Sequence, residues 1–168
     1  MQVSINGTNV AYEDHGAGPA VLLLHGFPFN RSIWKTQIQG LTLAGYRVIA
    51  PDLREYGQDS ASAVDFSLDV LSDDVVGLLN YLGIGRAVVV GRSLGVQLLN
   101  ALLKRYPQRV AAAVFVDSLH RINCHAKTEN ADYLADSENE TDITRRLLDF
   151  LHGVKRFRLR SPLYRQVA

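Results

Sequence analysis

The chain has 168 residues, a length that suits one domain with a sizeable core and is short for two. It is 47% hydrophobic and 21% charged, as globular proteins are, and its net charge of +1 excludes the strong basic excess of a nucleic-acid binder. A single cysteine, Cys124, permits no intramolecular disulfide, and neither a signal-like start nor a bilayer-length apolar run is present, so we expect a cytoplasmic protein with no membrane partner.

Charge divides the chain into two parts. Residues 1–118 carry 19 charged side chains, whereas the 50 residues of 119–168 carry 16. The regular apolar patterns also end near residue 118. We therefore predict that 1–118 is the well-patterned part of a domain and that 119–168 is an atypical charged tail, partly helical or disordered.

Strand-like and helix-like segments alternate through the first part. Short apolar runs predict strands at 3–5 and 9–12 around an Asn-Gly turn, and at 20–24, 46–50, 87–90 and 111–116. Apolar residues spaced by three and four predict helices at 32–43, interrupted by Gly40, at 68–82, between an N-cap Ser67 and a C′ Gly83, at 94–105 and at 142–152. This order predicts an α/β fold with a mostly parallel sheet and helices on both faces.

The sharpest motif is Gly91-Arg92-Ser93-Leu94-Gly95, between an expected strand and an expected helix. In that context G-x-S-x-G indicates a nucleophile elbow, a tight turn that lifts a serine oxygen above the sheet at a helix N-terminus. The alternative is a glycine-bracketed turn with an incidental serine.

A second motif, His25-Gly26-Phe27-Pro28, follows the expected strand at 20–24. A turn there would bring backbone N–H groups near Ser93, as an oxyanion requires. Phe27 and Leu94 are the candidate donors, because Pro28 has no N–H. We interpret His25 itself as structural. The charged segment 51–60 is interpreted as a loop fixed by local charge pairs.

Taken in order, these three motifs resemble the α/β-hydrolase fold family, and within it the small cofactor-free serine esterases, enol-lactonases and haloperoxidase-like hydrolases. The resemblance covers residues 1–118. It implies that Ser93 is the nucleophile, that Phe27 and Leu94 form the oxyanion hole, and that no cofactor or metal is needed. Serine rather than aspartate at the elbow argues against the dehalogenase and epoxide-hydrolase branches. The chain departs from the family pattern at Glu55, Arg92 and Val96.

The remaining catalytic residues are not identified by any strong motif. The family order places an acid and then a histidine after the serine, but 119–168 contains neither a strand-like apolar run nor a Gly-His sequence. By its position after the sixth expected strand, Asp117 is a weak candidate for the acid. His120, His125 and His152 are the possible bases, and His15 is an unlikely one.

Two functions remain open from the sequence. One is a serine hydrolase of small carboxylic esters, thioesters or lactones that works through an acyl-enzyme, in a pocket lined by Phe27, Phe29 and Trp34 if these aromatic residues are not ordinary core. The other is a truncated or degenerate, non-catalytic hydrolase-like protein or binding module. Without a seventh and an eighth strand, the strand at 111–116 would expose an apolar edge. We therefore expect a homodimer through that edge, an aggregation-prone monomer, or a tail segment folded over it.

Overall fold

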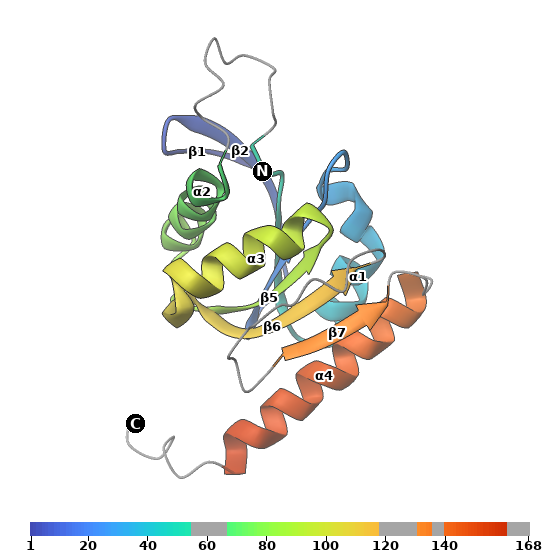
Figure 1. The fold of residues 1–168 in the computed structure, drawn as a ribbon. Helices are drawn as coiled ribbons and strands as arrows, with labels where there is room; N and C mark the ends of the chain where they lie inside the picture. Colours follow the sequence, from blue (N-terminus) through green and yellow to red (C-terminus); the bar gives the residue numbers. More distant parts are fainter. Residues whose placement is uncertain (55–66, 118–130, 136–139, 161–168) are drawn as a thin grey trace.

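The computed structural model describes residues 1–54, 67–117, 131–135 and 140–160. Within these ranges a single sheet of seven strands is covered by helices on both faces (Figure 1). The strands are β1 (Gln2–Ile5), β2 (Thr8–His15), β3 (Ala20–Leu24), β4 (Arg47–Pro51), β5 (Ala87–Arg92), β6 (Val110–Asp117) and β7 (Ala131–Ala135). The helices are η1 (Arg31–Trp34), α1 (Lys35–Leu43), α2 (Leu68–Tyr81), α3 (Leu94–Arg105), η2 (Pro107–Arg109) and α4 (Glu140–Arg160).

The sheet has the strand order β1-β2-β4-β3-β5-β6-β7. β1 and β2 form the expected hairpin, whose turn places Asn6 at φ 49° and Gly7 at φ 76°, the pair of left-handed residues that a tight hairpin needs. β2 also pairs antiparallel with β4, and every pair from β4 to β7 is parallel. The predicted fold class is confirmed, and β3, β5 and β6 bring their carboxyl ends to the same edge.

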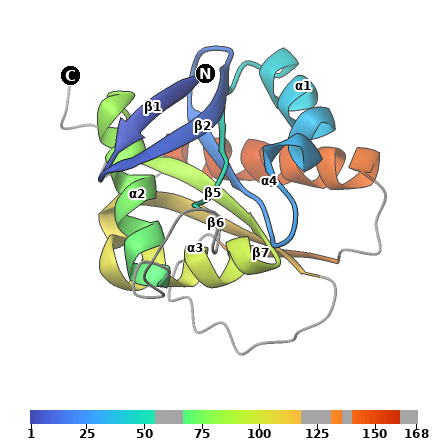
Figure 2. The ribbon, with the colours of Figure 1, turned by 90° about the horizontal axis from the view of Figure 1, so that it is seen from above.

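Alternate residues of the buried strands supply two separate cores. Leu22, Leu24 and Val89 face α2 and α3 on one side of the sheet. Val21, Leu23 and Val90 face α1 and α4 on the other (Figure 2). All six side chains are at most 1% exposed. Strands with both faces buried explain why the sequence shows continuous apolar runs instead of alternation.

Helix α1 runs through Gly40, where an interruption was expected. A Cβ on Gly40 would lie 2.5 Å from Cγ2 of Thr144 in α4, so the glycine lets the two helices approach closely. Gln37 strengthens the contact by donating from Nε2 to the Glu140 carbonyl, at 2.9 Å, and to Thr144 Oγ1, at 3.2 Å. Gly40 therefore serves helix packing and does not end the helix.

The region after residue 118 contains more structure than the sequence indicated. β7 is a strand where none was expected, and it pairs in parallel along β6 from Ala113 to Asp117. The edge of β6 that was expected to be open is therefore occupied, and a second copy cannot pair there. Of the three outcomes considered, a tail segment folded over the edge is the one observed, and the homodimer that was expected through the β6 edge has no open strand there to pair with.

Helix α4 covers part of the sheet. Its residues Ile143, Leu147 and Leu151 are at most 2% exposed and join the core between the sheet and α1. The helix begins at Glu140, two residues before the expected start at 142, and extends beyond the expected end at His152 through the basic run at 155–160. The boundary at residue 118 stays a prediction.

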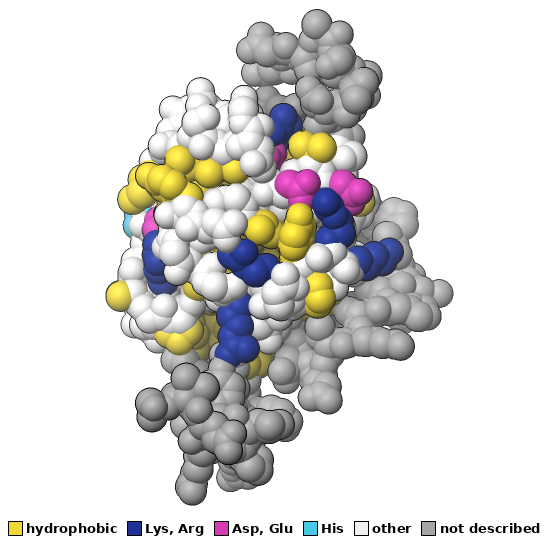
Figure 3. Space-filling view, turned by 90° about the vertical axis from the view of Figure 1, so that its left-hand side faces the viewer, with side chains coloured by type: hydrophobic (Ala, Val, Ile, Leu, Met, Phe, Trp, Pro, Cys, Tyr) yellow, Lys and Arg dark blue, Asp and Glu magenta, His cyan; other side chains and the backbone are white. Residues whose placement is uncertain are grey.

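The surface over α2 carries both signs of charge. Figure 3 shows acidic and basic side chains beside one another on this side of the molecule. The ion pairs there join Arg105 to Asp73, at 3.1 Å, and Arg54 to the buried Asp74, at 3.0 Å. In the described part of the chain, no helix has the combination of length and apolar character that a membrane crossing requires.

Candidate active site

Ser93 occupies a strained turn between β5 and α3. Its backbone has φ 55° and ψ −115°, and the only other non-glycine residue with positive φ among those described is Asn6. Such a conformation costs on the order of 1–3 kcal/mol and persists only where the surroundings impose it. Ser93 is exposed, and α3 begins at the next residue. The strand–turn–helix context that a nucleophile elbow requires is present.

The glycines on either side of Ser93 permit this turn. A Cβ on Gly91 would lie 2.3 Å from the Gly95 carbonyl oxygen, and a Cβ on Gly95 would lie 2.2 Å from the Leu24 carbonyl oxygen. Both clashes are with backbone, which cannot rotate away as a side chain can. The G-x-S-x-G spacing is thus explained by close approach of β3, β5 and α3. Val96, where a smaller residue was expected, is 3% exposed and packs in the α2–α3 core.

The segment after β3 lies directly against the elbow. A Cβ on Gly26 would be 2.5 Å from Ser93 Cβ and 3.1 Å from Ser93 Oγ. Phe29 donates its N–H to the Gly26 carbonyl at 2.9 Å, which closes a turn around Phe27. Leu94 is the first residue of α3, so its N–H has no intrahelical acceptor. Of the two residues expected to donate to an oxyanion, Leu94 follows Ser93 directly, and Phe27 follows the glycine that lies against it.

His25 is buried, with 6% of its surface exposed, and is joined to the backbone on both sides of its ring. Its Nε2 accepts the Leu53 N–H at 2.9 Å, and its Nδ1 lies 3.1 Å from the Gly26 carbonyl oxygen. These contacts fit the interpretation of His25 as structural.

Residues after β4 hold charge pairs but, contrary to the local interpretation of 51–60, the described ones do not pair with one another. Asp52 accepts the Arg31 N–H at 2.8 Å and forms an ion pair with the Arg31 guanidinium. Arg54 pairs with Asp74, which also accepts from the Asn6 side chain at 3.1 Å. The pairs are not local in sequence, since they connect the loop to η1, to the first hairpin turn and to α2. Residues 55–60, with Glu55, lie outside the described residues.

The structure does not bring a base or an acid to Ser93 among the residues it describes. Asp117 ends β6, paired with Ala135, and its side chain lies outside the description, as do His120 and His125. His152 is exposed on α4. No cluster of three metal-ligating side chains occurs within the described ranges.

The aromatic residues expected around a pocket separate into two groups. Trp34 is 1% exposed and belongs to the α1–α4 core, so for this residue the core interpretation is correct. Phe27 and Phe29 are 70% and 56% exposed and flank the turn that lies against Ser93. These two exposed aromatic residues stay the candidates for lining a substrate pocket.

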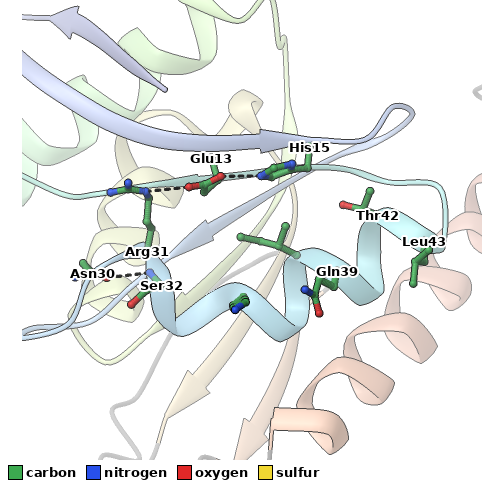
Figure 4. A pocket seen from close by; sticks show the side chains of 10 residues that line it. Glu13, His15, Asn30, Arg31, Ser32, Gln39, Thr42 and Leu43 are labelled. Atoms are coloured by element: carbon green, nitrogen blue, oxygen red, sulfur yellow. Dashed lines mark hydrogen bonds and ion pairs between the residues drawn. The ribbon is translucent and has the colours of Figure 1, made fainter.

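A separate pocket of about 880 Å³ lies between β2 and α1, and of the histidines considered as bases its lining includes only His15 (Figure 4). Its wall carries a chain of contacts, in which His15 Nε2 lies 2.7 Å from Glu13 Oε2 and Arg31 Nε lies 3.4 Å from Glu13 Oε1. The hydrogen bond with His15 is the main cause that lowers the pKa of Glu13. His15 thus has a carboxylate partner of its own, away from the elbow.

Sequence reasoning missed how Asp52, Leu53 and Arg31 connect the loop after β4 to the segment beside Ser93. A Pro-Asp pair directly after a parallel strand was the available signal, because that position lies at the same sheet edge as the elbow.

Comparison with known proteins agrees with this geometry. A family model described as alpha/beta hydrolase fold matches residues 19–154. An epoxide hydrolase from Caballeronia sordidicola is 44% identical over 114 residues, which are 66% of this chain and 34% of that protein. The crystal structure of an epoxide hydrolase from Vigna radiata has 35% identity and a TM-score of 0.65 over 69% of this chain and 37% of that one. A thermophilic esterase from Thermogutta terrifontis has 35% identity and a TM-score of 0.60, over 69% of this chain and 44% of that one.

The chain spans between 20% and 42% of the length of three curated relatives that it matches, all of them named epoxide hydrolases. The family match extends past residue 118 and includes α4 up to Val154. On the fold, the elbow and this match, the chain belongs to the alpha/beta hydrolase fold family.

Proposed function

We propose that this chain is a serine hydrolase that acts on a small carboxylic ester, thioester or lactone through an acyl-enzyme. The observation that carries the proposal is Ser93 at φ 55°, fixed between β5 and α3 and in contact with the Gly26 turn. A serine in this strained position presents its exposed side chain at the start of α3, and backbone outliers of this kind cluster at functional sites.

In the proposed reaction Ser93 Oγ attacks the carbonyl carbon while a base takes its proton. The carbonyl oxygen becomes an oxyanion and is stabilised by the N–H groups of Phe27 and Leu94. The intermediate collapses, the alcohol, thiol or ring oxygen leaves with a proton, and water then hydrolyses the acyl-Ser93 ester. His120, His125 and His152 stay the candidate bases, and Asp117 the candidate acid.

The nucleophile's chemistry favours acyl substrates over epoxides, although several relatives are named epoxide hydrolases. A serine oxygen that opens an epoxide would form an ether, which has no carbonyl for water to attack, so the enzyme would be consumed. Attack on an ester or lactone instead gives an acyl-enzyme that water can cleave. The similarity to the Thermogutta terrifontis esterase agrees with this choice.

A second candidate is a non-catalytic hydrolase-like protein. It is favoured by the absence of a base near Ser93 among the described residues. The two proposals differ in the reactivity of the Ser93 hydroxyl, because in a non-catalytic protein Ser93 would be an ordinary, unactivated alcohol. A cytoplasmic location is proposed for either function on the basis of cysteine content alone.

The deciding experiment treats the purified chain with a fluorophosphonate and measures intact mass. Activation of Ser93 predicts a gain of one probe mass, lost in Ser93→Ala and kept in Ser32→Ala, which removes another exposed serine, in η1. No gain on folded wild-type protein would refute the hydrolase and leave the non-catalytic candidate.

A further inference from the structure

We propose that Asp52 and Leu53 form a clamp that positions the oxyanion segment 26–31 beside Ser93, with His25 acting in it as a neutral imidazole that carries its proton on Nδ1. This proposal rests on the proposed function for its catalytic consequence, but its geometry can be tested without activity.

The tautomer of His25 follows from its two contacts. The Leu53 N–H can only donate, so the Nε2 atom that receives it at 2.9 Å carries no proton. A neutral imidazole then carries its proton on Nδ1, which donates to the Gly26 carbonyl oxygen 3.1 Å away. With both nitrogens engaged and 6% of the residue exposed, His25 cannot be the base for Ser93. It links the loop after β4 to the first residue of the oxyanion segment.

Asp52 holds the other end of the segment. One carboxylate oxygen accepts the Arg31 N–H at 2.8 Å, and the other pairs with the Arg31 guanidinium. Arg31 also contacts Glu13 on β2 at 3.4 Å (Figure 4). Two adjacent residues at the end of β4 therefore fix both ends of one short segment, Leu53 through His25 and Asp52 through Arg31.

Phe27 lies between these two anchors. The Phe29 N–H to Gly26 carbonyl bond closes the turn, and Gly26 lies against the Ser93 side chain. The position of the Phe27 N–H relative to Ser93 is thus set by the clamp, because the Phe27 side chain is 70% exposed and has little packing to hold it. An oxyanion donor works only within about 2.7–3.1 Å of the developing charge, so a displacement of about 1 Å removes most of its effect.

Two amide substitutions separate positioning from mere packing. His25→Gln places an amide oxygen at the distance of Nε2 and can still accept the Leu53 N–H. His25→Asn has the same functional group but reaches only as far as Nδ1. Asp52→Ala removes the other anchor. We expect the rate of fluorophosphonate labelling at Ser93 to fall roughly 10- to 100-fold in His25→Asn and in Asp52→Ala, and to recover most of its value in His25→Gln.

Two measurements test the clamp independently of labelling. Nitrogen NMR of the wild-type protein should show His25 protonated on Nδ1 and not on Nε2. Hydrogen exchange should show the Leu53 amide protected in the wild type and in His25→Gln, and exposed in His25→Asn.

Each outcome bears on one proposal. A protonated Nε2, or equal Leu53 exchange in the Gln and Asn variants, overturns the clamp. Equal labelling rates in wild type and His25→Asn overturn its positioning role. If the wild type is not labelled at all, the proposed hydrolase fails, while the NMR and exchange results still decide the clamp.

Discussion

The close contact between α1 and α4 makes the effect of Gly40→Ala on stability depend on one methyl group, Cγ2 of Thr144. Replacing Gly40 by alanine in an isolated helix stabilises it by about 0.5–1 kcal/mol. Here the new Cβ would lie 2.5 Å from Cγ2 of Thr144. Thr144 cannot easily rotate away, because its hydroxyl donates to the Glu140 carbonyl at 2.8 Å and accepts from Gln37 at 3.2 Å.

Overpacking of this kind costs about 1–3 kcal/mol. Gly40→Ala should therefore lower the free energy of unfolding by about 0.5–2 kcal/mol, once the helix gain is subtracted. In Thr144→Ser the methyl is absent and the hydroxyl is retained, so the same Gly40→Ala change should raise stability by about 0.5–1 kcal/mol.

The assay is urea unfolding followed by circular dichroism on wild type, both single variants and the double variant. Gly153→Ala is the matched control, because it lies in α4 with nothing within 4 Å of the added Cβ and should stabilise in either background. The same sign for Gly40→Ala with threonine and with serine at position 144 would refute the close approach of the two helices.

Two further predictions concern α4 and acid stability. Leu147→Ala should lower the free energy of urea unfolding by about 2–5 kcal/mol, because Leu147 is fully buried between α4 and the sheet. The control Asp149→Ala, at an exposed position of α4, should stay within about 0.5 kcal/mol of wild type, and similar values for the two variants would show that α4 is not part of the core. The hydrogen bond to His15 lowers the pKa of Glu13 below its ordinary value of 4.5. The ionised Glu13 therefore stabilises the folded state fully above pH 4.5, and this stabilisation is lost as the pH falls through the lowered pKa. Glu13→Gln should therefore flatten the acid side of the stability–pH curve, and an unchanged slope in urea titrations below about pH 5 would contradict this.

The central sheet could be predicted because its signals are local. Val21 to Leu24 and Val88 to Val90 are continuous apolar runs, and a strand buried on both faces requires little else to be recognised. The elbow motif was recognisable because its two glycines and its serine lie within five residues, although Gly95 is needed because the Leu24 carbonyl of β3 lies against it. For these elements the residues that identify the structure lie close together in sequence.

The errors arose where tertiary contacts decide. Gly40 was interpreted as a helix interruption, because nothing nearby in sequence reveals that Thr144 needs the space. β7 was missed because Ala131-Asp132-Tyr133-Leu134-Ala135 has a charged residue and no β-branched one, so its strand form depends on pairing with β6. The clamp was missed for the same reason, since Asp52 and Arg31 are 21 positions apart.

The two cores on opposite sides of the sheet must close in a fixed order while the chain is being synthesised. The described residues of the α2–α3 core lie between Val3 and Phe115, so this core can close once that length has left the ribosome. The α1–α4 core also needs Ile143 to Val154 and cannot be complete until those residues have emerged. During that interval the side of the sheet that carries Val114 and Val116 lacks the cover of α4, which makes this face the one that a nascent-chain chaperone would have to shield.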